Sequence, residues 1–215
     1  MIKAIFFDYD GTTMNTNDLI LASWDHLFTE LEGKPRPHEV IMPYFGEPVS
    51  EAAAKFLPEY DPMEILQKFR SYQKKTYMDM IYPFDGIEEL LKTLNERGIR
   101  CFTVTNRLTD MTVEGYAKFG LDRYFEGIIG FEHTERNKPF PDPIYYTLER
   151  YGLEKDEVLM VGDSRFDLMA ADAAGVRSAV VDWTIADPEL RSGLKADHHM
   201  KTPQDLLRIL EELNA

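Results

Sequence analysis

Residues 2–13, IKAIFFDYDGTT, place two carboxylates, Asp8 and Asp10, directly after an apolar run and next to Gly11. Residues 2–7 have the composition of a short buried strand. Two like charges this close repel each other and cost stability unless something offsets them. Because the two aspartates are two positions apart in an extended chain, both side chains can face the same side. Taken alone, the pattern is equally typical of a plain turn, since Asp and Gly are common in turns.

Four further β-rich runs follow later in the chain, at residues 99–105, 125–130, 157–162 and 177–183. Helical patterns lie between and after them. Residues 85–98 carry apolar side chains at helical spacing and end at Gly98, whereas residues 141–152 begin with prolines and end at Gly152. Residues 203–214 show the same apolar stripe. This alternation predicts an α/β fold with a Rossmann-like core, in which a parallel sheet is flanked by helices.

One connection between strands is much longer than the others. A parallel strand–helix–strand unit takes about 30 residues, but here the alternation resumes only near residue 82. The intervening chain has helical patterns at residues 17–33, 51–57 and 61–80. Asp61 is placed to cap the last of these, with Pro62 in its first turn. We therefore expect an α/β core at residues 1–14 and 82–215 and a small inserted α-helical domain at residues 15–81.

The composition narrows the classes of partner and compartment. A formal net charge of −14 over 215 residues argues against nucleic acid and anionic membrane surfaces. No apolar run reaches the roughly 20 residues that span a bilayer. Cys101 is the single cysteine, which is typical of a reducing compartment. No leader is recognisable, so we expect a cytoplasmic location. We also expect a monomer or weak dimer. His198 and His199 have no third ligand that would suggest zinc and are interpreted as surface residues.

Residues that follow the strands are candidates for a site, because ligands bind beyond the carboxyl ends of strands in an open α/β sheet. Thr105 and Asn106 follow the second β-rich run, and Asp163 and Asp167 follow the fourth. A hydroxyl and free backbone N–H groups ahead of a helix can bind phosphate. Together with the first aspartate pair, the second pair would concentrate oxygen ligands at one edge, which suits Mg²⁺. In the segment KPFPDP, prolines hold the loop that begins with Lys138 in a rigid conformation. This loop would direct the Lys138 ammonium group at the four aspartates.

These motifs resemble those of the haloacid dehalogenase-like hydrolase superfamily. The matching residues are Asp8 to Thr12 (Asp-x-Asp-Gly-Thr), Thr105, Lys138 with its prolines, and Gly162 to Asp167 (Gly-Asp-x-x-x-Asp). Their order agrees throughout residues 1–183. The inserted helices resemble the cap of the phosphoglycolate phosphatase-like subgroup, which lies between the first and second motifs. Asp10 is acidic as in the family's phosphatases and phosphomutases, whereas dehalogenases, phosphonate hydrolases and P-type ATPases have no acidic residue there.

The resemblance implies a chemistry for these residues. Asp8 would be the nucleophile that forms an aspartyl-phosphate, and Asp10 would protonate the leaving group and later deprotonate water. Thr105, Asn106 and Lys138 would bind the phosphoryl group and neutralise its charge. The implied cofactor is Mg²⁺, and its implied ligands are Asp8, Asp10 through its backbone carbonyl, Asp163, and Asp167 in support.

The inserted segment would select the substrate. Its loop at residues 44–50, YFGEPVS, resembles the substrate-facing turn of phosphoglycolate phosphatases. Gly46 and Glu47 are therefore candidates for specificity, although Gly46 could equally be a plain turn residue. Three cations of the last inserted helix are interpreted as solvated charges: Arg70, Lys74 and Lys75.

The leading hypothesis is a Mg²⁺-dependent, phosphoglycolate phosphatase-like enzyme that hydrolyses a small phosphorylated metabolite, a phosphomonoester. A β-phosphoglucomutase-like enzyme is the alternative, since it would keep both Asp8 and Asp10 but return the phosphoryl group to a sugar. A catalytically silent binding module on the same fold is a third hypothesis, disfavoured because every expected catalytic position is filled.

Overall fold

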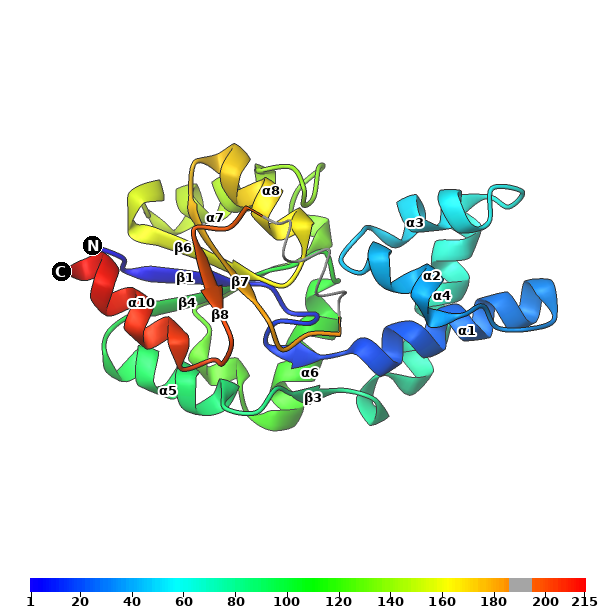
Figure 1. The fold of residues 1–215 in the computed structure, drawn as a ribbon, viewed down its shortest axis with the longest axis horizontal. Coiled ribbons are helices and arrows are strands. Elements are labelled where there is room, and N and C mark those ends of the chain that lie inside the picture. The colour runs from blue at the N-terminus through cyan, green and yellow to red at the C-terminus, as the bar shows by residue number, and fades with distance from the viewer. Residues whose placement is uncertain (186–194) are drawn as a thin grey trace.

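The computed structural model describes residues 1–185 and 195–215, and its centre is a six-stranded sheet with the order β5-β4-β1-β6-β7-β8 (Figure 1). Every strand pairing in this sheet is parallel. The strands are β1 (Ala4–Phe7), β4 (Arg100–Val104), β5 (Gly127–Ile129), β6 (Val158–Gly162), β7 (Arg177–Val181) and β8 (His198–Met200). The expected α/β fold is confirmed, and the five β-rich runs of the sequence contain the first five of these strands.

The sixth strand, β8, was missed. His198 and His199 were interpreted as surface residues, but they belong to β8, which pairs with β7 at the edge of the sheet. His199 is exposed, His198 is half-buried and Met200 is fully buried. Three residues with a single buried side chain are too few for alternation to be recognised in a sequence.

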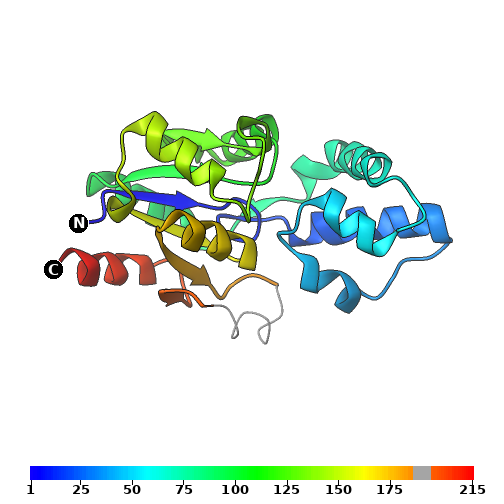
Figure 2. The same cartoon turned by 90° about the horizontal axis from the view of Figure 1, so that it is seen from above.

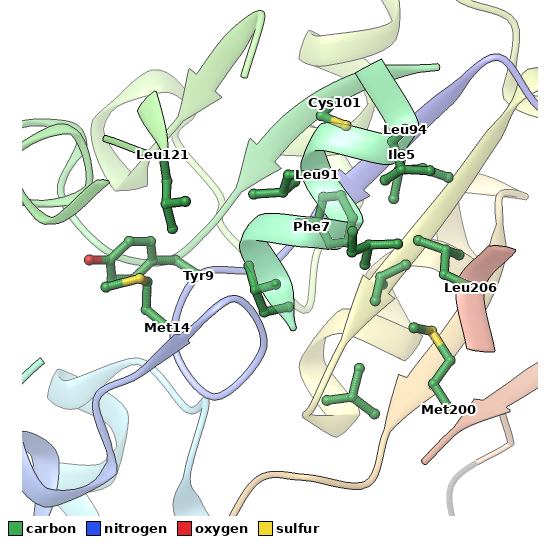
Figure 3. Close-up of a cluster of buried hydrophobic side chains, with 14 of the residues drawn as sticks. Ile5, Phe7, Tyr9, Met14, Leu91, Leu94, Cys101, Leu121, Met200 and Leu206 are labelled. Atoms are coloured by element: carbon green, nitrogen blue, oxygen red, sulfur yellow. The ribbon is translucent and has the colours of Figure 1, made fainter. Parts of the chain in front are cut away.

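The two faces of the sheet are covered by α5 (Ile87–Glu96), α6 (Thr109–Phe119), α7 (Asp142–Tyr151), α8 (Arg165–Ala174) and α10 (Asp205–Asn214). Successive side chains of β1 point to opposite faces. Ile5 and Phe7 pack in one hydrophobic cluster with residues of α5, α6 and α10, part of which Figure 3 shows. Ala4 and Phe6 pack in a second cluster with residues of α7 and α8. β1 is therefore buried on both sides and holds the residues that follow it in a rigid place.

Four helices form a separate body: α1 (Asn17–Glu32), α2 (His38–Ile41), α3 (Val49–Phe56) and α4 (Pro62–Thr76). Figure 2 shows that this body lies to one side of the sheet. It has its own hydrophobic cluster around Trp24, whose ring centre lies 5.1 Å from that of Phe56 and 5.2 Å from that of Phe69. The expected group of inserted helices is thus present as a body with its own core.

Two short strands connect this body to the sheet. β2 (Met14–Asn15) pairs antiparallel with β3 (Tyr82–Pro83). Three residues of the inserted segment, Leu19, Tyr77 and Ile81, pack in the hydrophobic cluster of the sheet rather than in that of the helical body. The proposed domain division at residues 15–81 stays a prediction.

Short 3-10 helices complete the chain: η1 (Met42–Tyr44), η2 (Tyr77–Asp79), η3 (Asp122–Tyr124), η4 (Phe131–His133) and η5 (Lys155–Glu157). Cys101 is buried and free, as expected. Among the residues that the structure describes, none of the helices has the length and apolar character needed to cross a membrane.

Candidate active site

Three loops meet at the carboxyl-terminal edge of the sheet because β4, β1 and β6 are parallel neighbours. Asp8 follows β1, Thr105 follows β4 and Asp163 follows β6. A cavity of about 130 Å³ lies there, and its walls include Asp8 and Thr105 from the sheet edge and residues of α1, α3 and α4 from the helical body. The site therefore lies between the two parts of the molecule.

Asp8, Asp163 and Asp167 are buried and present carboxylate oxygens that lie within 4.8 Å of one another. Lys138, from the loop before α7, is 2% exposed. Its Nζ lies 2.9 Å from Asp8 Oδ1 and 2.5 Å from Asp167 Oδ1. The fold thus brings together four residues that the sequence singled out on three separate segments. We call the three aspartates the acidic triad.

Burial makes the carboxyl groups of Asp8 and Asp163 costly to ionise. Burial raises the pKa of Asp8 to about 7, although Lys138 opposes this shift. The carboxylates of Asp167 and Asp10 add to the increase. Burial, followed by the carboxylates of Asp167 and Asp8, raises the pKa of Asp163 well above its usual range. Burial alone would lower the pKa of Lys138, but the two neighbouring carboxylates outweigh it and raise that pKa. One ammonium therefore faces three buried carboxyl groups, and a cation bound beside them would lower the cost of ionising Asp8 and Asp163.

A divalent cation fits this cluster, because carboxylate oxygens are the ligands that hard ions such as Mg²⁺ prefer. Gly11 packs directly against the carboxylate of Asp163. Its φ is +71°, and a Cβ there would lie 2.1 Å from Asp163 Oδ2, so a larger residue would displace this carboxylate. The same oxygen accepts a hydrogen bond of 3.0 Å from Thr184 Oγ1. The acidic triad therefore offers the oxygen ligands that a magnesium ion takes, and Asp163 is held in place by its neighbours.

Asp167, in the first turn of α8, is engaged on both oxygens. Oδ1 accepts from Lys138, and Oδ2 accepts from Ser164 at 3.0 Å from the backbone N–H and 2.7 Å from Oγ. A Cβ at Gly162 would lie 2.3 Å from Asp167 Cγ, so a glycine is needed where this carboxylate packs against the end of β6. These contacts suit a residue that holds Lys138 and the loop in place.

The carboxylate of Asp10 lies outside the acidic triad and pairs with Arg107. Arg107 Nη2 lies 2.7 Å from Asp10 Oδ1, and Nε lies 3.0 Å from Oδ2. Thr16 Oγ1 donates to Oδ1 at 2.6 Å. Arg107 is buried and was missed in the sequence, although its position two residues after Thr105, at a strand end, was a usable signal.

Thr105 and Asn106 line the cavity. Thr105 is buried, and its Oγ1 accepts a hydrogen bond of 3.2 Å from the backbone N–H of Arg107. Asn106 Nδ2 donates to the carbonyl of Lys138 at 2.9 Å and so connects two loops of the site. Asn106 Oδ1 is buried and has no hydrogen-bond partner among the described residues.

The loop at residues 44–50 lines the cavity on the side of the helical body. Gly46 has a φ of +82°, and a Cβ there would lie 2.6 Å from Ser164 Cβ. This glycine therefore allows the loop to contact the start of α8. Glu47 lines the cavity and pairs with Lys55. Its other oxygen, Oε2, is buried and unpartnered among the described residues.

The interpretation of Arg70 as a solvated charge is wrong. Arg70 is half-buried and lines the cavity, whereas Lys74 and Lys75 on the same helix are exposed as expected. Gln73, which was not among the candidates predicted from the sequence, is buried and also lines the cavity. Its spacing of three residues from Arg70 places both on one face of α4. That spacing was the signal available in the sequence.

Comparisons with known proteins agree with these features. The family model of the haloacid dehalogenase-like hydrolases matches residues 5–181. A relative from Caldanaerobacter subterraneus, provisionally named pyrophosphatase PpaX, is 36% identical over 211 residues, which cover 98% of this chain and 95% of the relative. Pyrophosphatase PpaX of Halalkalibacterium halodurans is 31% identical over 210 residues, covering 97% of each chain.

Solved structures give the same result. A haloacid dehalogenase-like hydrolase from Streptococcus pneumoniae is 25% identical and superposes with a TM-score of 0.87, covering 97% of this chain and 98% of that one. The match of the family model over most of the chain and the identity to full-length relatives exceed what a shared fold alone would produce. This chain belongs to the haloacid dehalogenase-like hydrolase family.

Proposed function

We propose that this protein is a phosphatase that transfers a phosphoryl group from a small phosphorylated metabolite to Asp8 and then to water. The observation that carries the proposal is the arrangement of the Asp8 carboxylate, which lines the cavity. Its Oδ1 contacts Lys138 Nζ at 2.9 Å and accepts from the backbone N–H of Tyr9 at 2.7 Å. Neither contact uses Oδ2, which is therefore the oxygen assigned to attack phosphorus. Carboxylates act as nucleophiles of this kind in phosphoryl transfer.

The surrounding residues have complementary roles in this proposal. Lys138, with Thr105 and Asn106, neutralises charge on the transferred phosphoryl group, where most of the catalysis of phosphoryl transfer arises. Asp10 protonates the leaving oxygen, and it later removes the proton of the water that attacks the phosphorylated Asp8. The contacts of its carboxylate with Arg107 and Thr16 support a fixed position for this group.

A Mg²⁺ ion is part of the proposal. Its ligands would be the carboxylates of Asp8 and Asp163 and the backbone carbonyl of Asp10, with Asp167 in support. When bound, Mg²⁺ supplies positive charge beside the phosphoryl oxygens. The clustering of three buried carboxyl groups in the acidic triad supports this assignment.

Two substrate classes have support. The resemblance of residues 44–50 to the loop of phosphoglycolate phosphatases favours a small phosphomonoester. The relatives named pyrophosphatases favour inorganic pyrophosphate as a second candidate. A phosphomutase remains the alternative, and product analysis with a sugar 1-phosphate separates it, because hydrolysis releases free phosphate and a mutase releases an isomeric sugar phosphate.

We propose that residues 15–81 act as a cap that selects the substrate, with Gly46 and Glu47 in its specificity loop. The support is the position of the loop, which lines the same cavity as Asp8. Closure of such a segment excludes water from the reaction.

Paired variants test the assignment of the two aspartates. With p-nitrophenyl phosphate, Asp8→Asn should have background activity, because no acyl phosphate can form. Asp10→Asn should lose about 10²–10⁴-fold in turnover, yet release a burst of p-nitrophenol, because this leaving group needs no proton. Mass spectrometry of acid-quenched Asp10→Asn should then find phosphate on the peptide that contains Asp8.

The control is Asp172→Asn, an exposed carboxylate of α8, which should retain wild-type turnover. Robust turnover by Asp8→Asn, or a phosphate adduct on another residue, would contradict the proposal.

A further inference from the structure

Within residues 1–185 and 195–215, one cationic side chain of the cavity forms no ion pair. Three cationic side chains line it: Arg70, Arg107 and Lys138. Lys138 faces two aspartates of the acidic triad, and Arg107 faces Asp10. Among the residues that the structure describes, Arg70 is the one of the three that forms no ion pair with a carboxylate. An anion in the cavity would therefore pair with this guanidinium without displacing a carboxylate from it.

The surroundings of Arg70 also favour the binding of an anion. Its guanidinium carbon lies 5.3 Å from the centre of the Phe131 ring, which supports one face of the group. Burial lowers the pKa of Arg70, and Glu132 only partly opposes this shift. The carboxylate of Glu132 accepts from the backbone N–H of Thr109 at 3.1 Å, so it already has a partner. A partly desolvated cation of this kind gains when an anion replaces the lost water.

Gln73 provides an independent observation. It is 4% exposed, and its Oε1 accepts a hydrogen bond of 3.3 Å from Arg107 Nη1. Because a guanidinium can only donate, the oxygen of the amide must face Arg107 and the nitrogen must face elsewhere. Gln73 Nε2 is buried and has no hydrogen-bond partner among the described residues. A buried donor without a partner is costly, and this one lies on a side chain that lines the cavity.

We propose that the guanidinium of Arg70 and Nε2 of Gln73 form a second anion-binding subsite, which takes a carboxylate or phosphate group carried by the substrate's leaving group. This inference rests on the proposed function, in which the transferred phosphoryl group lies at Asp8 and Lys138. The substrate class is then a small phosphate ester or anhydride with a negative charge at each end. In pyrophosphate the second anion is the leaving phosphate itself, and in a phosphorylated hydroxy acid it is a carboxylate.

Matched substrates isolate the contribution of the second anion. The enzyme with Mg²⁺ is assayed with pyrophosphate, with 2-phosphoglycolate, and with 2-hydroxyethyl phosphate, which has an alcohol in place of the carboxylate. The quantity compared is the selectivity ratio, kcat/KM for each anionic substrate divided by kcat/KM for 2-hydroxyethyl phosphate. We expect this ratio to exceed one in the wild type for at least one of the two anionic substrates.

The variants are Arg70→Gln, Arg70→Lys and Lys74→Gln. Arg70→Gln should lower the selectivity ratio by roughly tenfold to a hundredfold, which corresponds to the loss of a charge-assisted hydrogen bond. Arg70→Lys should recover part of the ratio. Lys74→Gln removes the same charge from the exposed side of α4 and should leave the ratio unchanged. A general electrostatic effect would lower the ratio in both glutamine variants and would overturn the proposal.

The two anionic substrates distinguish the source of the second anion. A fall for pyrophosphate alone assigns a phosphate to the subsite, and a fall for 2-phosphoglycolate alone assigns a carboxylate. A wild-type ratio near one for both, or a ratio that Arg70→Gln does not change, rejects the subsite.

Binding without turnover separates this inference from the proposed function. Isothermal titration measures methylenediphosphonate, a non-hydrolysable analogue of pyrophosphate, against methylphosphonate, which has one anionic group. If the protein hydrolyses none of the substrates, the proposed function fails. The subsite is still supported if Arg70→Gln weakens only the binding of the diphosphonate, and it is rejected if both ligands bind equally well to wild type and variant.

Discussion

Gly11 is the residue at which backbone conformation and site chemistry are coupled most closely. Its φ of +71° lies in the region that favours glycine, and a side chain there would collide with the carboxylate of Asp163. Gly33 has a φ of +80°, and a Cβ at that position would have no atom within 4 Å. Both glycines have a positive φ that disfavours other residues. Of the two, only Gly11 would also produce a steric clash if it carried a side chain.

We predict that Gly33→Ala destabilises the fold by about 1–2 kcal/mol, because it forces alanine into the left-handed region, and that Gly11→Ala destabilises it by more, because its methyl group also collides with Asp163. Only Gly11→Ala should also weaken Mg²⁺ binding, since its methyl group displaces Asp163. Urea unfolding gives the free energies, and isothermal titration gives the Mg²⁺ affinity. Equal Mg²⁺ affinity in the two variants would show that Asp163 is not held by this contact.

At the level of elements, α4 connects the helical body to the cavity, because it packs against α1 and α3 and carries both Arg70 and Gln73. Its start is determined by local chemistry. Asp61 Oδ1 accepts a hydrogen bond of 2.9 Å from the backbone N–H of Met63, and Pro62 is the first helical residue. Both features were expected from the sequence and are confirmed.

We predict that Asp61→Ala lowers the free energy of unfolding by about 0.5–2 kcal/mol, the usual cost of removing an N-cap. Asp61→Asn keeps an oxygen acceptor and should lose less than half as much. Chemical denaturation monitored by circular dichroism measures both. If the two variants lost the same stability, the charge of Asp61 would matter rather than its hydrogen bond.

At the level of the whole molecule, the acidic triad links stability to cation binding. Asp8, Asp163 and Asp167 repel one another in the buried native state, and unfolding releases them into water. A cation that binds only the native state stabilises it by about 2.7 kcal/mol at a hundred times its Kd. For a chain of this size, that corresponds to roughly 5–11 °C in Tm.

We therefore predict that Mg²⁺ raises the Tm by several degrees relative to the protein in EDTA, as measured by differential scanning calorimetry. Asp163→Asn removes one of the repelling charges, so it should have a higher Tm than wild type in EDTA and a smaller response to Mg²⁺. An unchanged response in this variant would exclude Asp163 from the cation site.

Much of the fold and of the candidate site was determined by local patterns in the sequence. The run of residues 2–7 predicted the central strand, and the spacing of Asp8 and Asp10 indicated an acidic site at its end. Two further candidates came from equally local patterns. Lys138 lies in a proline-rich loop, and Asp163 follows an apolar run. Each inference depended on a few neighbouring residues, because secondary-structure propensity and the geometry of strand ends act over short distances.

The contacts between distant segments were decided by the tertiary structure alone. The pairing of Arg107 with Asp10 joins two loops because β4 lies beside β1, an order that no local pattern records. Arg70 and Lys74 carry the same charge on the same helix, yet of the two only Arg70 lines the cavity, because packing of α4 on its neighbours determines which of its faces is covered. Strand β8 likewise exists because β7 offers it an edge to pair with. The sequence determined which polar groups follow the strands, and the packing of the sheet against the helical body determined which of them face one another.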